Sequence, residues 1–168
     1  MSQIEPADSN RSTVHASFVI ERTYDAAPEA VFGAWADPAA KAQWFGPPNK
    51  PEGSYTLEFR EGGREHLAMP LPDGSAVYSF DAVYQDIVAG KRIIYTYDMH
   101  RDSARMSVSV AAVELEARGT GTHLTLTEHG VYLDGLDTPA EREHGTNVLM
   151  DTLGAYVDSQ GASARAPQ

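Results

Sequence analysis

The chain has 168 residues, of which 42% are hydrophobic and 22% charged, a composition that suits one globular domain with a substantial core. Acidic residues outnumber basic ones 24 to 13, and the resulting net charge of -11 disfavours binding to nucleic acids or to anionic membrane surfaces. The absence of cysteine excludes disulfides, thiolate chemistry and cysteine-based zinc sites.

The two ends of the chain have the composition of disordered tails. Residues 1–13 and 161–168 are rich in Ser, Ala, Asp, Arg and Pro, which are common in segments that bury no core. The start lacks the basic and apolar stretches of a signal peptide, and no apolar run approaches the roughly 18 residues of a membrane span. We therefore expect a cytoplasmic protein with one domain over residues 14–160 and no membrane partner.

The domain is predicted to begin with one strand and two short helices. Apolar and polar side chains alternate over residues 14–24, which is the pattern of a half-buried strand. A helix is expected from about Pro28, with Trp35 on its apolar face. A second helix begins at Pro38 and ends before the tandem prolines Pro47-Pro48.

Residues 53–130 form a succession of predicted strands separated by short turns. Apolar side chains alternate along each run, and the breaks contain Gly, Pro and Asp, for example in Glu61-Gly62-Gly63 and Gly119-Thr120-Gly121. Strands that follow one another through short turns form an antiparallel meander. Together with the first strand, this pattern predicts seven strands.

The last predicted element is a long helix from Pro139 to Gln160. Thr138-Pro139-Ala140-Glu141 matches a capping box with proline at the first helical position, and Gly161 is a plausible stop. Gly145 lies inside this helix, where glycine is about 1 kcal/mol less favourable than alanine. That cost indicates either close packing against the sheet or a notch at a pocket, and we favour close packing.

These elements predict an α+β fold in which a curved seven-stranded antiparallel sheet wraps around the long C-terminal helix. The sheet needs a cover for its apolar face, and only this helix is large enough to supply it. The two short helices would close one end. We expect a cavity between sheet and helix.

Four segments together resemble a known superfamily. They are WFGPP, LEFREGGREH, YQDIVAGKRIIYTY and ELEARGTGTHLTLTEHG, in this order along residues 44–130. The chain resembles SRPBCC (START-like) proteins, in the branch related to the activator of the heat-shock chaperone ATPase and labelled polyketide-cyclase-like. The resemblance implies the helix-grip fold over about residues 15–160. Members of this superfamily include ligand carriers, cyclases, hydrolase-like enzymes, hormone receptors and chaperone regulators.

Strand parity and the apolar stripe of the last helix together predict side chains that line the cavity. Leu124 and Leu126 should point toward the helix, which places Glu128 on the same face. A carboxyl group in an apolar cavity has a raised pKa, so Glu128 is the best candidate for a general acid or base. The predicted ligand-binding side chains are Trp35, Tyr78, Tyr84, Tyr95, Tyr97, Glu128, Leu149 and Leu153.

The sequence predicts no metal site and no cofactor. His123 and His129 lie roughly 20 Å apart along one strand and cannot share an ion. The known histidine and carboxylate metal motifs are missing, and Gly119-Thr120-Gly121 lacks the third glycine of a dinucleotide loop.

The strand around residues 105–117 raises a question of parity. If Val113 and Leu115 point inward, then Met106, Val108 and Val110 point outward as an apolar row. Either a bulge near Ala111-Ala112 switches the parity, or a second copy of the chain covers the row. We expect a homodimer.

Two functions of different classes fit this sequence. The first is binding of a small hydrophobic ligand in the cavity, as a carrier, sensor or sequestering protein. The second is an enzyme of the cyclase or hydratase kind that uses Glu128 or a tyrosine as acid or base. A third, a module that regulates a chaperone, follows from the family resemblance alone. The absence of a recognisable catalytic constellation favours the first function.

Overall fold

The computed structural model describes residues 11–165, so most of the predicted N-terminal tail, residues 1–10, and the last residues, 166–168, lie outside it. None of the helices in this range has the length and apolar character that a bilayer crossing requires. The elements are β1 (Thr13–Tyr24), α1 (Pro28–Ala36), α2 (Pro38–Trp44), β2 (Tyr55–Leu57), β3 (Arg64–Pro70), β4 (Val77–Val88), β5 (Arg92–Arg101), β6 (Ala104–Arg118), β7 (Gly121–Leu133) and α3 (Pro139–Arg165).

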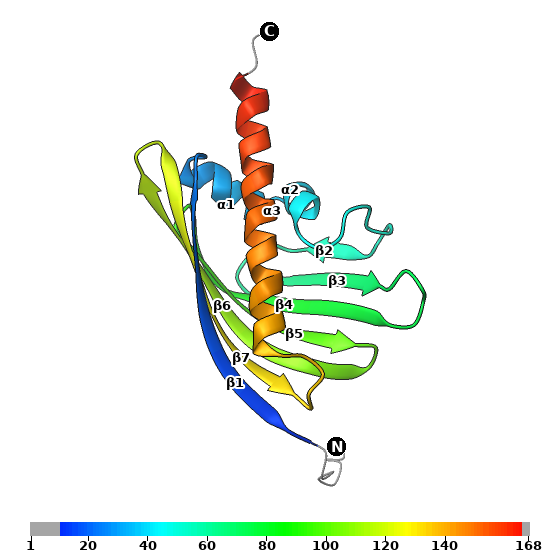
Figure 1. Cartoon of the computed structure of the whole chain (residues 1–168). Coiled ribbons are helices and arrows are strands. Elements are labelled where there is room, and N and C mark those ends of the chain that lie inside the picture. The colour runs from blue at the N-terminus through cyan, green and yellow to red at the C-terminus, as the bar shows by residue number, and fades with distance from the viewer. Residues whose placement is uncertain (1–10, 166–168) are drawn as a thin grey trace.

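The strands of the described chain form one antiparallel sheet in the order β1-β7-β6-β5-β4-β3-β2. Strands β2 to β7 are a meander, and β1 pairs with β7 at the far edge, where Phe18 lies opposite Glu128. Figure 1 shows the sheet curving around α3, with α1 and α2 at one end. The predicted α+β helix-grip fold with seven antiparallel strands is therefore confirmed.

A β-bulge in β6 changes which side chains face inward. Met99 pairs with Ser107 and His100 pairs with Arg105, so Met106 is the extra residue of the bulged strand. Met106 is buried and lines the cavity described below. The prediction that Met106 points outward was wrong, because the bulge reverses the alternation at this position.

Two large apolar side chains of β6 do face outward. Val108 and Val110 are 45% and 37% exposed. The pairing of β5 with β6 continues without a shift at Ala111 and Ala112, so no bulge occurs there. The apolar row is thus shorter than expected, and the homodimer stays a prediction.

Helix α3 starts where its cap predicts and ends later than expected. The Glu141 amide donates to Thr138 Oγ1 at 3.2 Å, as in a capped helix. The helix passes through Gly161 to Arg165, because Gly161 lacks the positive φ with which glycine ends a helix. Gly154 allows close contact with β1, since a Cβ there would lie 2.9 Å from Cε1 of Tyr24.

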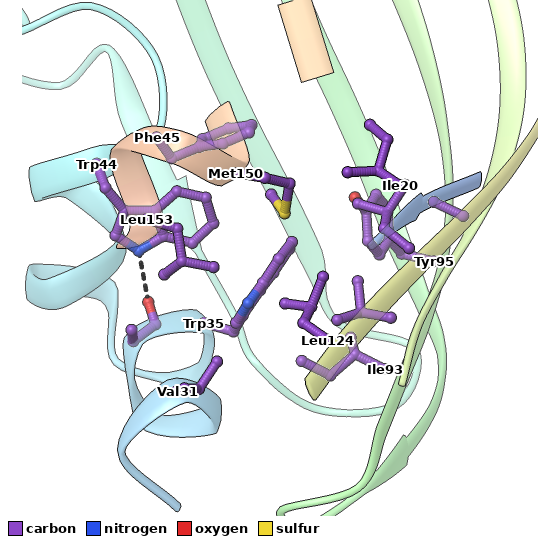
Figure 2. Close-up of a cluster of buried hydrophobic side chains, with 14 of the residues drawn as sticks. Ile20, Val31, Trp35, Trp44, Phe45, Ile93, Tyr95, Leu124, Met150 and Leu153 are labelled. Carbon is purple, nitrogen blue, oxygen red and sulfur yellow. Dashed lines mark hydrogen bonds between the residues drawn. The ribbon is translucent and has the colours of Figure 1, made fainter. Parts of the chain in front are cut away.

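The core lies between the three helices and the concave face of the sheet. The rings of Trp35 and Trp44 meet edge to face with centroids 4.9 Å apart. Trp44 Nε1 donates to the Ala34 carbonyl at 2.9 Å, the dashed bond in Figure 2. Figure 2 also shows Met150 and Leu153 of α3 beside these rings, and both are fully buried. This packing joins α1 and α2 to the middle of α3.

Candidate functional site

A cavity of about 410 Å³ lies between the N-terminal half of α3 and the concave face of the sheet. Ligand sites in proteins typically measure about 300–1,000 Å³, so its size suits a small organic molecule. Most of its wall is apolar or aromatic, from α1, α2, the strands and α3: Trp35, Trp44, Phe45, Leu67, Met69, Tyr78, Phe80, Tyr95, Tyr97, Met99, Met106, Leu126, Leu149 and Met150.

Gly145 forms a notch in the helical wall of the cavity. It lines the cavity, and a Cβ added to it would meet no other atom within 4 Å. The expectation that Gly145 packs closely against the sheet was therefore wrong. Gly145 is exposed, so it lies where the cavity borders solvent, and its missing side chain leaves open space there.

Glu128 is the buried carboxylate of the cavity. It is 2% exposed, and its Oε1 accepts a hydrogen bond from the Tyr97 hydroxyl at 2.8 Å. Its Oε2 has no hydrogen-bond partner and lies 4.0 Å from Nη1 of Arg142. Burial raises the pKa of Glu128 from 4.5 to about 7, against the opposing effects of the Tyr97 hydrogen bond and the Arg142 charge. Glu128 therefore exchanges its proton near neutral pH.

Arg142 connects the polar side chains at one end of the cavity through hydrogen bonds. Its Nη2 donates to Ser107 Oγ at 2.7 Å and to Asp137 Oδ2 at 2.6 Å. Its Nη1 donates to the Tyr97 hydroxyl at 2.9 Å. The guanidinium thus fixes the phenol that donates to Glu128, while its closest carboxylate is that of Asp137.

Six of the eight side chains predicted to bind the ligand line the cavity: Trp35, Tyr78, Tyr95, Tyr97, Glu128 and Leu149. Tyr84 and Leu153 do not. Each has the predicted inward orientation, but both are fully buried in the core. That a ligand contacts the six remains a prediction.

Tyr84 belongs to a separate buried polar cluster that the sequence did not indicate. Lys41 Nζ donates to Glu65 Oε1 at 2.7 Å and to the Tyr84 hydroxyl at 3.1 Å. The hydroxyls of Tyr84 and Tyr55 donate to Glu65 Oε1 and Oε2 at 2.7 and 2.6 Å. Burial lowers the pKa of Lys41, and the Glu65 charge opposes that shift. The polar groups of this cluster find their hydrogen-bond partners within the cluster, which favours a structural role.

Arg142 and Asp137 are the functional candidates that sequence reasoning missed. A signal for Arg142 exists: it lies three residues before Gly145 and seven before Leu149, on the helix stripe that faces the sheet. Asp137 lies just before the helix cap and has no comparable pattern.

On the outer face, one group of side chains in the described chain comes close to a metal site. Asp81, Asp98 and His100 each place a ligand atom within 4.8 Å of the others. His66 Nδ1 lies 2.6 Å from Asp81, and Asp98 lies 3.3 Å from Arg105. These contacts already give both carboxylates a partner, so we assign no metal to this group.

Comparisons with known proteins place this geometry in a family. The family model described as Activator of Hsp90 ATPase homolog 1-like protein matches residues 25–158. A solved structure of an uncharacterised protein from Rhizobium leguminosarum is 39% identical, covers 89% of this chain and 98% of its own, and superimposes with a TM-score of 0.84. A protein from Rhizobium loti is also 39% identical, with 86% and 99% coverage and a TM-score of 0.80.

A more distant structure shares the fold. The AHSA1-like protein from Aeromonas hydrophila is 23% identical over 91% of this chain and 99% of its own, with a TM-score of 0.65. No curated protein matches the chain. With a family model matched over most of its length and the helix-grip architecture in place, the chain belongs to the Activator of Hsp90 ATPase homolog 1-like family of the SRPBCC superfamily.

Proposed function

We propose that the protein binds a small, mainly apolar molecule in the cavity between α3 and the sheet, as a carrier, sensor or sequestering protein. The observation that carries this proposal is a cavity of about 410 Å³ with an apolar wall and a buried carboxylate oxygen that lacks a partner. An apolar wall supplies affinity, and a few polar atoms orient the ligand.

Two polar atoms of the lining are unpaired in the described structure. Glu128 Oε2 is an acceptor without a donor, and Trp35 Nε1 is a donor without an acceptor. Buried polar groups generally have hydrogen-bond partners, and leaving one unmet costs about 1–3 kcal/mol. A ligand that meets either group would recover part of that cost, which favours a molecule with polar substituents on an apolar body.

The chain contains its own reporter for this binding. Its 2 tryptophans, Trp35 and Trp44, both line the cavity. Titration with an uncharged apolar dye such as Nile red should therefore change tryptophan emission in a saturable way, with one dye per chain. Native mass spectrometry of protein purified from its own host would supply the mass of a co-purifying ligand.

A cavity-filling variant and a matched control make the test specific. Gly145→Phe should place a ring at this border of the cavity and weaken dye binding. Replacement of glycine inside a helix also favours folding. Gly161→Phe is the same substitution in the same helix, also with open space around the new Cβ, but outside the cavity lining. Equal dye binding by both variants would contradict the proposal.

A second candidate function is acid–base catalysis of the cyclase or hydratase kind in the same cavity. The specific observation is Glu128, whose burial raises its pKa to about 7 while one of its oxygens has no hydrogen-bond partner in the protein. The test is to incubate the co-purified ligand, or its precursor, with wild type and with Glu128→Gln. Conversion that requires the carboxyl group supports an enzyme, whereas binding without conversion supports the carrier.

A further inference from the structure

The charged side chains around the cavity do not balance. Its lining contains the acidic residues Glu128, Asp137 and Glu141 and the basic residue Arg142. The guanidinium of Arg142 is committed to Asp137, with 2.6 Å between Nη2 and Oδ2. Glu128 lies farther from the guanidinium, with 4.0 Å between Oε2 and Nη1. The ionised carboxylate of Glu128 is therefore incompletely compensated by the protein.

The position of the unpaired oxygen makes this imbalance relevant to a ligand. Glu128 is 2% exposed, lines the cavity, and is fixed at its other oxygen by the Tyr97 hydroxyl. Oε2 is the atom left without a donor. An ionised carboxylate only accepts hydrogen bonds, so the group that completes it must carry an N–H or O–H.

The aromatic wall favours a cationic donor over a neutral one. Aromatic faces attract ammonium groups, and the effect grows when the cation is desolvated. The protein already holds one ammonium in this environment: Lys41 Nζ lies 4.9 Å from the ring centroid of Trp35 and 4.5 Å from that of Phe45. Both rings also line the cavity. Lys41 itself is paired with Glu65 at 2.7 Å, so its charge is compensated.

Resting on the proposed function, we propose that the ligand is an organic amine, with an apolar body in the aromatic part of the cavity and a protonated nitrogen that donates to Glu128 Oε2. The acidic excess of the lining and the net charge of -11 would attract such a ligand and repel fatty acids and other anions. Arg142 does not offer a carboxylate a free site, because Tyr97, Ser107 and Asp137 accept its hydrogen bonds.

The test compares three probes with the same alkyl chain: octylamine, octanol and octanoate. Each is titrated into the full chain at about pH 8, where the amine is protonated and Glu128 is ionised, with displacement of Nile red and tryptophan emission as readouts. We expect octylamine to bind most tightly and octanoate least. Glu128→Gln should weaken octylamine about tenfold or more, as expected when one partner of a buried charged pair is removed, and should leave octanol nearly unchanged.

A control variant separates the local carboxylate from the overall charge. Glu143 is exposed on α3 and does not line the cavity, so Glu143→Gln removes one negative charge outside the cavity and should not alter octylamine affinity. Equal affinity for octanol and octylamine, or an equal effect of the two Gln variants, would overturn the amine inference while the apolar cavity function stands. Tightest binding of octanoate would also overturn it. If neither dye nor any probe binds, the proposed function fails as well.

Discussion

Replacement of Glu128 by glutamine should change the pH dependence of stability. Burial raises the pKa of this carboxyl from 4.5 to about 7. The other groups that act on it are the Tyr97 hydroxyl of β5, through its hydrogen bond, and the charges of Arg142 in α3 and Asp137 before α3. A carboxyl with a raised pKa retains its proton in the folded state where the unfolded chain has lost it. Its contribution to stability is therefore present at low pH and is lost as pH rises through about 7.

The magnitude follows from the size of the pKa rise. Each pKa unit corresponds to about 1.36 kcal/mol, so the full rise amounts to about 3 kcal/mol, of which about 2 to 3 kcal/mol is lost between about pH 5 and pH 8. Glutamine does not titrate, and its Oε1 still accepts the Tyr97 hydrogen bond. The variant should gain that amount of stability relative to wild type between the two pH values.

Urea unfolding at both pH values measures this difference directly. All other ionisable groups are common to both proteins, so their contributions cancel in the comparison. Glu143→Gln serves as the control for loss of one negative charge. If Glu128→Gln differs from wild type by the same amount at about pH 5 and at about pH 8, the carboxyl is not destabilised by burial. The proposal that it acts as an acid or base near neutral pH would then lose its basis.

Three further predictions concern the rest of the fold. Lys41→Met leaves buried Glu65 without its cationic partner, so urea unfolding should show that the free energy of unfolding falls by about 3–5 kcal/mol. Adding Glu65→Leu to this variant should restore most of that stability. A double variant less stable than the single one would contradict this. Gly145→Ala should raise the free energy of unfolding by about 1 kcal/mol, because alanine favours the helix and the notch has room for the methyl group; thermal unfolding checks this, and a lower melting temperature would be inconsistent with an open notch. If the chain is a homodimer through the outer face of β6, Val108→Asp should give a monomer in sedimentation with little loss of stability, since the side chain is 45% exposed; wild type that sediments as a monomer at both low and high salt would exclude the dimer.

The fold could be predicted because its signals are local. Strands with alternating apolar and polar side chains, joined by short turns, pair as an antiparallel meander. The capping residue Thr138 marks the start of α3. The end of α3 was missed because glycine permits a helix end without requiring one, and Gly161 keeps a helical backbone. Helix ends without a strong stop signal are set by packing that the local sequence does not contain.

The site could be predicted wherever a strand alternates without interruption. Counting by two from Leu124 places Glu128 inside, and the same rule places Tyr97 inside. The rule failed at Met106, because a bulge depends on how β6 pairs with β5 and leaves no mark in one strand alone. It also could not separate Tyr97 in the cavity from Tyr84 in the core, since that difference depends on what packs against each ring.

Buried charges were the least predictable feature. Lys41 lies in helix α2 and Glu65 in strand β3. Within its own segment, each is a charged residue of the kind usually found at the surface. Arg142 lies on the apolar stripe of α3, yet a charged residue in an amphipathic helix is usually assigned to solvent. Such groups become visible only when the fold brings their partners together, since burial of a charge requires that partner.

The unpaired oxygen of Glu128 links stability to function. A protein selected for stability alone would place a donor beside it or replace it with an apolar side chain, because an unmet buried acceptor destabilises the fold. This chain has neither at Glu128, although its separate buried cluster around Lys41 and Glu65 is fully hydrogen-bonded. Local violations of this kind are expected at sites that serve a ligand. A donor ligand should therefore stabilise the protein most above pH 7 or so, where Glu128 is ionised, and Glu128→Gln should lose that extra stabilisation because its amide no longer needs a cation.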